Sequence, residues 1–317
     1  MMSTNILNEY QALMEAYEKN GGNIGEFANP NIPSIVIGGN KVLGKNQIKG
    51  LIIHSVPTSN GVDVKITVKS GTKVLHPMAL CFGVIPKEGT QIINMETTIE
   101  NNAGMNAISH CVFPNAEHIV HKMNYKINIG QNSFFRYKEI HFHGSKGGVE
   151  VIPYTKGTVG ENSLFISTFT LKEGRVGKLD IKYDIDIMKK GKLELYSKVW
   201  AKEDDKVQIE EKGNLQGDEA RALIKSRVVL EDEAKSKVLS VVNAYAPYSR
   251  GHVDCTEIVQ DNAVAEAIPI VRVFNHLAKV THEAAIGSID SKELETLEAR
   301  GLSKEEAVKI IVEGLLK

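Results

Sequence analysis

The sequence predicts a mainly β protein with a parallel β-helix core and short α-helical segments at both ends. Three observations support this fold class: short β-type runs separated by turn residues, an internal repeat of thirty residues, and helix-type patterns confined to the two ends of the chain. The 317 residues include 38 Lys+Arg, 39 Asp+Glu and 42% hydrophobic residues, which is typical of a globular protein. The net charge of −1 provides no general attraction to nucleic acid or anionic lipid.

Residues 1–30 are predicted to form an N-terminal helical segment. Apolar residues between positions 4 and 20 recur at spacings of three and four, which places them on one face of a helix. The predicted helix ends at Gly21 and Gly22. Its apolar stripe consists of Leu7, Tyr10, Leu13, Met14 and Tyr17.

Residues 31–280 are predicted to form the β core. Runs rich in β-branched and aromatic residues, such as Val62–Val68 and Lys178–Ile187, alternate with Gly, Asn and Asp at turns. A β region of this length fits a sandwich, a barrel or a solenoid, and internal repetition distinguishes the solenoid from the other two.

The core sequence repeats. Ile129–Phe135 matches Val159–Phe165 at an offset of thirty residues. A small residue at a fixed place in each copy fits a coil of strands, because the stacked corners of such a coil leave little space. We therefore expect a β-helix; the alternative is a chance similarity among turn residues. Weaker copies occur at Leu230–Ala234, Val259–Ala263 and Phe274–Ala278.

Residues 281–317 are predicted to form a C-terminal helical segment. Asp290 and Ser303 are each followed three residues later by a glutamate, which is the pattern of an N-cap with a capping box. We expect the two helices to cover the open edge of the last rung and to offer an apolar groove or stripe to a partner; capping alone is the simpler alternative. Gly314 on that stripe suggests close approach of another element. The stripe consists of Ala307, Ile310, Ile311, Gly314 and Leu315.

The sequence contains no phosphate-binding glycine loop, no nucleophile elbow and no zinc-protease histidine pair. Asp180, Asp184 and Asp186 alternate along one strand face. They could supply the carboxylates of a carbohydrate-cleaving β-helix. A solvated strand face explains the same alternation more simply.

The cysteine content and the N-terminus indicate a cellular compartment. Cys81, Cys111 and Cys255 are an odd number, too small for a disulfide framework. The N-terminus lacks the pattern of a secretory signal, and no apolar stretch has the length of a membrane span. We therefore expect a cytoplasmic protein whose cysteines are thiols, ligands or core residues.

Residues 110–143 contain a first group of possible metal ligands. Thiol and imidazole groups suit zinc or iron. His141 and His143 would face the same side of a strand, because strand side chains alternate with a period of two. The simpler alternative is that these groups are hydrogen-bonded turn and rung-edge residues. The group comprises His110, Cys111, His118, His121, His141 and His143.

A second group combines His252 and Cys255 with His282 and Glu283. Cys255 and His282 are 27 positions apart, close to the repeat offset, so they could lie on neighbouring rungs at the same end of the coil. A thiolate, an imidazole and a carboxylate meeting there would make an iron or persulfide site. Consecutive residues such as His282 and Glu283 point to opposite faces unless the strand bends. The alternative is a buried, inert Cys255.

The C-terminal motifs resemble a known family. From about residue 225 to residue 317, the motifs and the order in which they occur resemble the C-terminal core of the SufB/SufD family of the SUF iron–sulfur cluster assembly machinery. The most specific piece is the histidine motif followed at fixed spacing by Leu-x-x-x-Arg-Gly and Glu-Ala. The motifs are Gly251–Cys255, Ala267–Pro269, His282–Gly287, Leu294, Leu297, Arg300–Leu302 and Glu306–Ala307.

This resemblance implies a right-handed parallel β-helix that dimerises through its last rungs. It implies that the C-terminal helices dock a SufC-like ABC-type ATPase, and we expect Leu302, Ile310 and Ile311 to contact it. SufB-like members carry the functional cysteine that matches Cys255, whereas SufD-like members generally lack it. The absence of a long N-terminal extension and of a Cys-x-x-Cys motif suggests the compact archaeal form, working as a homodimer.

The resemblance also implies a function. Cys255, His282 and Glu283 would bind a transient iron–sulfur cluster, so that the protein is a scaffold and the ATPase activity resides in its partner. Two alternatives remain at this stage. One is a SufD-like organising subunit without a cluster of its own, and the other is a β-helix carbohydrate-active enzyme.

Overall fold

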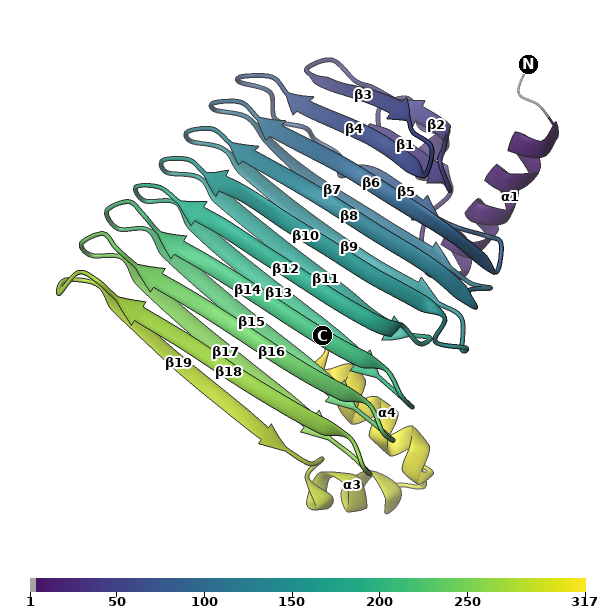
Figure 1. The fold of residues 1–317 in the computed structure, drawn as a ribbon, viewed down its shortest axis with the longest axis vertical. Helices are drawn as coiled ribbons and strands as arrows, with labels where there is room; N and C mark the ends of the chain where they lie inside the picture. The colour runs from purple at the N-terminus through teal and green to yellow at the C-terminus, as the bar shows by residue number, and fades with distance from the viewer. Residues whose placement is uncertain (1–3) are drawn as a thin grey trace.

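The protein is a two-sheet parallel β-solenoid with short helices at both ends. The computed structural model describes residues 4–317, and it stacks a 10-stranded sheet, here sheet A, face to face with a 9-stranded sheet, sheet B. Figure 1 shows the strands stacked as successive rungs, from the first strands at the top to β19 at the bottom. The predicted parallel β-helix with short terminal helices is confirmed.

The chain alternates between the two sheets at almost every corner, so that odd-numbered strands belong to sheet A and even-numbered strands to sheet B, except β2 and β3. Sheet A contains β1 (Ser34–Gly38), β2 (Lys41–Asn46), β5 (Met78–Gly83), β7 (Gly104–Phe113), β9 (Phe134–His143), β11 (Leu164–Glu173), β13 (Lys192–Ala201), β15 (Arg221–Leu230), β17 (Arg250–Val259) and β19 (Lys279–Gly287). Sheet B contains β3 (Leu51–Pro57), β4 (Gly61–Val68), β6 (Glu88–Ile99), β8 (His118–Ile129), β10 (Val149–Val159), β12 (Gly177–Ile187), β14 (Lys206–Leu215), β16 (Lys235–Ala244) and β18 (Val264–Val273).

The corner motif of the repeat joins each rung to the next. Asn132 and Asn162 both adopt φ 53°, a left-handed conformation that asparagine tolerates better than most residues. The Ser133 backbone N–H donates to Ser163 Oγ at 2.9 Å, and Asn162 Nδ2 donates to Asn132 Oδ1 at 2.8 Å. A Cβ added at Gly130 would lie 2.8 Å from the backbone nitrogen of Asn101. The repeated residues are therefore those that allow successive corners to stack and to form hydrogen bonds with one another.

The weaker copies of the repeat do not all mark the same corner. Phe274–Ala278 connects sheet B to sheet A, as Ile129–Phe135 does. Leu230–Ala234 and Val259–Ala263 connect sheet A to sheet B, at the opposite corner. Both kinds of corner contain residues with positive φ, for example Asn132 at the corner from sheet B to sheet A and Asp232 at the corner from sheet A to sheet B. Similar turn requirements thus made different corners look alike in sequence.

The core fills the lumen between the two sheets. Residues in successive rungs pair at offsets of 28 to 30, as between Val159 and Ile187 or between Phe135 and Phe165. Like side chains therefore stack in columns, and the rings of Phe135 and Phe165 lie parallel with centroids 5.7 Å apart. Neighbouring rungs together bury apolar side chains that a single pair of strands would leave exposed.

Helix α1 (Thr4–Lys19), followed by the short α2 (Gly25–Ala28), covers the outer face of sheet A at its N-terminal end. Leu13, Met14 and Tyr17 pack there, whereas Leu7 is 46% exposed. The predicted helix and most of its stripe are confirmed, and Leu7 was wrongly included. None of the helices within residues 4–317 is long and apolar enough to cross a membrane.

Helices α3 (Ser291–Glu298) and α4 (Lys304–Leu315) follow the last strand. Asp290 and Ser303 are their N-caps, and Ser303 forms a complete capping box with Glu306. α4 packs on the outer face of sheet A, where Val312 and Leu316 contact the cluster that contains Trp200 and Val229. The prediction that these helices cover the open edge of the last rung is therefore wrong for α4.

The predicted apolar stripe of α4 also differs from the buried face. Ala307 is buried as predicted, but Ile310 is 48% exposed and Ile311 and Leu315 are only partly buried. A Cβ added at Gly314 would meet no atom within 4 Å among the described residues. The suggested close approach at Gly314 does not occur within the single chain. The reason is that the helix turns Val312 and Leu316 toward the sheet.

The last rung, formed by β18 and β19, is uncovered on its C-terminal side by residues 4–317. β18 and β19 are the terminal strands of their sheets, so each leaves a row of backbone groups unpaired. The lumen-facing and corner side chains there are exposed or only partly buried. Large apolar residues with exposures of about 40–60% are Val264, Val273, Phe274, Leu277 and Ile286.

We predict that Phe165→Ala lowers the free energy of unfolding by about 3–5 kcal/mol, because a fully buried aromatic ring is replaced by a cavity. Urea denaturation followed by circular dichroism measures this loss. Tyr154→Ala is the matched control, since this ring is 40% exposed and its removal should cost less than about 1 kcal/mol. Equal losses in the two variants would contradict the assignment of Phe165 to the stacked core.

Candidate functional site

Cys255 lies on β17 with its side chain inside the coil. Buried and partly exposed residues alternate along this strand, and both Val253 and Cys255 are buried, so their side chains share the lumen face. The cysteine is 1% exposed. It pairs with Ser226 on the preceding rung and with Ala284 on the last one. The thiol is thus one rung away from the open end.

His282 and Glu283 lie on β19, the edge strand of sheet A. His282 pairs with Val253, and Glu283 pairs with Asp254. Because paired residues in a sheet share a face, His282 lies on the lumen side and Glu283 on the outer side. Both residues are exposed. The sequence offset therefore correctly placed Cys255 and His282 on neighbouring rungs, and the two consecutive residues do face opposite sides.

The three predicted ligands do not form one set within the single chain. Among the described residues, the one group of three or more His, Cys, Asp or Glu with ligand atoms within 4.8 Å of one another consists of Cys111, Glu139 and His141. Any shared binding by Cys255, His282 and Glu283 requires a movement of the last rung or a contribution from a second chain.

Polar groups surround the Cys255 thiol. Its Sγ lies 3.5 Å from Ser240 Oγ, and two buried carboxyl groups, Glu211 and Glu257, face the same lumen. Burial raises the pKa of Cys255, although the hydrogen bond with Ser240 opposes the shift. Burial likewise raises the pKa of Glu211 to about 7. The closed coil therefore keeps this thiol protonated and unreactive at neutral pH.

The outer face beside Glu283 carries an ion-pair network. Arg227 donates two hydrogen bonds to the Asp254 carboxylate, at 2.9 and 2.7 Å, and Lys225 approaches the same group at 3.0 Å. The hydrogen bonds from Arg227 lower the pKa of Asp254 to about 2. This network joins β15 to β17 and leaves Glu283 on the next strand as an exposed carboxylate beyond it.

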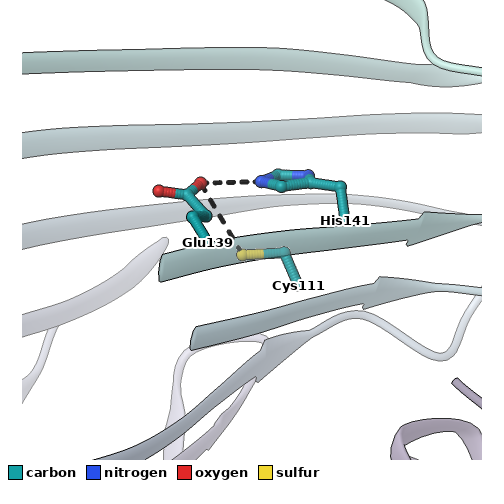
Figure 2. A group of neighbouring side chains, drawn as sticks. All are labelled: Cys111, Glu139 and His141. Atoms are coloured by element: carbon teal, nitrogen blue, oxygen red, sulfur yellow. Dashed lines mark hydrogen bonds and ion pairs between the residues drawn. The ribbon is translucent and has the colours of Figure 1, made fainter. Parts of the chain in front are cut away.

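The histidine-rich group of residues 110–143 divides between two faces. Cys111, His121, His141 and His143 are buried in the lumen, as the period of two predicted for the last two. His110 instead lies under α1, with its ring 4.5 Å from that of Tyr17, and His118 is exposed. Figure 2 shows Cys111 and His141 converging on Glu139.

Burial controls the protonation of this lumen group. It lowers the pKa of His121 and of His141 to about 3, so both imidazoles are neutral. It raises the pKa of Glu139 to about 7 and that of Cys111 well above its usual value. The group therefore consists mainly of uncharged ligand side chains in a dry interior.

The aspartates that could have suggested carbohydrate chemistry are paired on an outer strand face. Asp180 Oδ2 lies 3.3 Å from Lys182 Nζ, and Asp184 Oδ2 lies 3.3 Å from Lys212 Nζ. Asn214 bonds both Asp184 and Asp186. This ladder is the solvated strand face that the sequence also allowed.

The residues predicted to contact an ATPase lie around α4. Leu302 and Ile311 are partly buried and Ile310 is exposed. The buried side of α4 is separate from them, since Val312 and Leu316 pack against sheet A. Substitution at Ile310 can therefore test binding without disturbing the helix packing.

The fold defines a first, general class: parallel β-solenoids with helical ends and an open last rung. Comparison with known families then identifies the family. The model described as SUF system FeS cluster assembly, SufBD core domain, matches residues 86–315. The chain belongs to the SufBD family.

Similar proteins match the chain over nearly its whole length. An iron–sulfur cluster assembly SufBD family protein of Methanocaldococcus jannaschii is 38% identical over 98% of this chain and 98% of its own. A second, from Pyrococcus horikoshii, is 36% identical over 98% of this chain and 95% of its own. The iron–sulfur cluster assembly protein SufB of Bacillus subtilis is 23% identical over 87% of this chain and 59% of its own.

Sequence reasoning missed Glu139 and the buried polar residues around Cys255. Glu139 lies between Lys138 and Ile140 in a strand whose sequence is typical of a half-buried strand. A signal was present, because Glu139, His141 and His143 occupy alternate positions and thus one face. Ser226, Ser240, Glu211 and Glu257 lie on four different strands, and only the register of the rungs brings them together.

We predict that Cys255 is alkylated far more slowly in the native protein than in the unfolded chain. We also predict that the increase of the alkylation rate with pH begins at a higher pH in the native protein than in the unfolded chain. The reason is that a raised pKa leaves less thiolate at a given pH. Iodoacetamide labelling across a pH series, with peptide mass spectrometry to resolve each cysteine, measures both effects. The urea-unfolded chain is the control. Equal labelling of native and unfolded protein at neutral pH would show that the thiol is open to solvent.

Proposed function

We propose that this chain is a SufB-like scaffold on which an iron–sulfur cluster is assembled and from which it is transferred, without enzymatic turnover of its own. The observation that carries this proposal is similarity to iron–sulfur cluster assembly proteins over 98% of the chain. The position of the Cys255 thiol, in the lumen and one rung from the open end, supports it as well.

In this proposal, Cys255, His282 and Glu283 bind the transient cluster as cargo. A thiolate, an imidazole and a carboxylate form a mixed ligand set, and such a set releases a cluster more readily than four thiolates do. His282 and Glu283 are already exposed. Cys255 is covered by the last rung, so cluster binding requires β19 to move and the thiol to lose its proton.

We further propose that a second copy of the chain covers the last rung, giving a homodimer. The unpaired edges of β18 and β19 and the exposed apolar residues beside them support this proposal. Such an edge is a template for pairing with another chain. A twofold contact there would bring two sets of His282 and Glu283 close to the covered thiols.

The partner that would drive opening is proposed to be a SufC-like ABC-type ATPase docking on the C-terminal helices. α4 supports this proposal, because it is anchored on sheet A by one face while Ile310 remains exposed on another. ATP hydrolysis in the partner would shift α3 and α4, which follow β19 directly. That movement would rearrange the dimer and expose Cys255.

One observation favours the alternative of a SufD-like organising subunit: the Cys255 thiol is 1% exposed and has a raised pKa. An organising subunit would never open this site. The iron and acid-labile sulfide content of protein purified anaerobically, after co-expression with the ATPase, separates the two roles.

We predict that anaerobic reconstitution with ferrous iron and sulfide produces cluster absorbance in the visible region, and that Cys255→Ala removes most of it. The loss follows because the thiolate ligand is gone. Cys81→Ala is the matched control, since Cys81 is buried beneath α1, outside the lumen. A full-strength spectrum in Cys255→Ala would refute the ligand assignment.

We predict that Ile310→Asp lowers the affinity for the ATPase at least tenfold, equivalent to about 1.4 kcal/mol, without changing stability. Binding measured by calorimetry, and unfolding by circular dichroism, report the two effects. Ile311→Asp and Leu302→Asp should also weaken binding, whereas Lys309→Ala, on the same helix, should not. Unchanged affinity in Ile310→Asp would indicate that α4 serves only to cover sheet A.

A further inference from the structure

A second group of ligand side chains lies in the lumen far from Cys255. Cys111 is on β7 and pairs directly with His141 on β9, and Glu139 precedes His141 by two positions on the same face. β7 and β17 are five strands apart in sheet A. At about 4.8 Å per strand this separation is about 24 Å, so the two sites cannot share a ligand.

The donor atoms of this lumen group nearly enclose a common point. Glu139 Oε1 lies 2.7 Å from His141 Nε2 and 4.0 Å from Cys111 Sγ. The three ligand atoms lie within 4.8 Å of one another. A tetrahedral zinc ion has sulfur at about 2.3 Å and nitrogen or oxygen at about 2.0–2.2 Å, so its ligands are about 3.3–3.7 Å apart. The 2.7 and 4.0 Å distances lie on either side of this range.

His121 provides an independent indication of a ligand. It projects from β8 on the opposite sheet, is 1% exposed, and has no hydrogen-bond partner at either ring nitrogen among the described residues. Its ring centroid lies 6.1 Å from that of His141. Buried polar atoms without partners are costly and rare. The imidazole is not part of the group within 4.8 Å, so it would turn toward a bound cation to offer its vacant lone pair as a fourth ligand.

The group also contains the supporting contact that metal-binding histidines usually have. His141 Nδ1 lies 3.2 Å from His143 Nε2, so His141 can donate its Nδ1–H while Nε2 faces Cys111 and Glu139. Such a bond fixes the tautomer and orientation of a ligating imidazole. Phe113 and Phe169 pack against these rings at centroid distances of 4.7 to 6.4 Å and exclude water.

Charge balance favours the same occupant. A buried thiolate beside a buried carboxylate is costly without a cation, so the metal-free group keeps its thiol protonated and metal binding would release that proton. A divalent ion bound by one thiolate, one carboxylate and two neutral imidazoles would form a neutral centre. Sulfur and nitrogen ligands suit zinc or ferrous iron and disfavour magnesium or calcium.

We propose that Cys111, Glu139, His141 and His121 form a binding site for a divalent transition-metal ion of the zinc or ferrous type, with His143 as the positioning residue. The ion would tie β7 and β9 of sheet A to β8 of sheet B across the lumen. The site is independent of the cluster assembly proposed at Cys255.

The first test uses the full-length Cys255→Ser protein, stripped by chelator and loaded anaerobically with one equivalent of Zn²⁺. X-ray absorption should show one sulfur at about 2.3 Å and nitrogen or oxygen ligands at about 2.0–2.2 Å. The background variant removes the thiol at the other site, so that a failure of the cluster proposal cannot affect the result. A shell without sulfur would overturn the proposed site.

The second test uses Co²⁺ as a spectroscopic probe in the same background. We predict one bound equivalent with thiolate-to-cobalt charge transfer, which Cys111→Ser removes and Cys81→Ser retains. His143→Phe should weaken binding about 10–100-fold while keeping the charge-transfer band, and exposed His118→Ala should leave affinity unchanged. Displacement of Co²⁺ by Zn²⁺ or Fe²⁺ supports the proposal. An unchanged band in Cys111→Ser, or displacement by Mg²⁺ alone, would overturn it.

Discussion

The parallel register between rungs is the constraint on which the rest of this structure depends. From β5 onward, successive strands of each sheet pair at offsets of 28 to 30 residues. The corners hold this offset through residues with positive φ, such as Asn132 and Asp232, and through serine hydroxyl bonds to the next rung. Because the register repeats, side chains at equivalent positions stack in columns along the lumen. Whether a side chain is buried depends on which face of its strand it occupies and on whether another rung follows it.

This constraint produces two ends with different chemistry. At the N-terminal end α1 packs on the outer face of sheet A, and the first strands pair antiparallel. At the C-terminal end β18 and β19 expose backbone edges and apolar side chains. α4 turns back onto the sheet and leaves this end uncovered. The open end is therefore the place where a second chain or a moving last rung can reach the lumen.

The lumen contains buried polar groups, although the interior of a solenoid of this kind could be entirely apolar. Carboxyl groups at Glu139, Glu211 and Glu257 are each at most 3% exposed, and burial raises the pKa of all three. Buried polar groups cost stability unless they are bonded or bind something. Their placement beside Cys111 and Cys255 links the interior of the coil to the chemistry proposed at both thiols.

The sequence alone determined the local elements: the capped C-terminal helices, the N-terminal helix, and the β core with its thirty-residue repeat. These depend on contacts between residues close in the chain or on a period that the sequence displays directly. Tertiary structure decided which face of α4 is buried, which corners correspond, and that Cys255 is enclosed while His282 and Glu283 are exposed. It also brought Glu139 to Cys111 and His121 across the lumen. Such placements depend on the packing of separate rungs and sheets, because a residue's neighbours across a coil are set by register and not by its own sequence context.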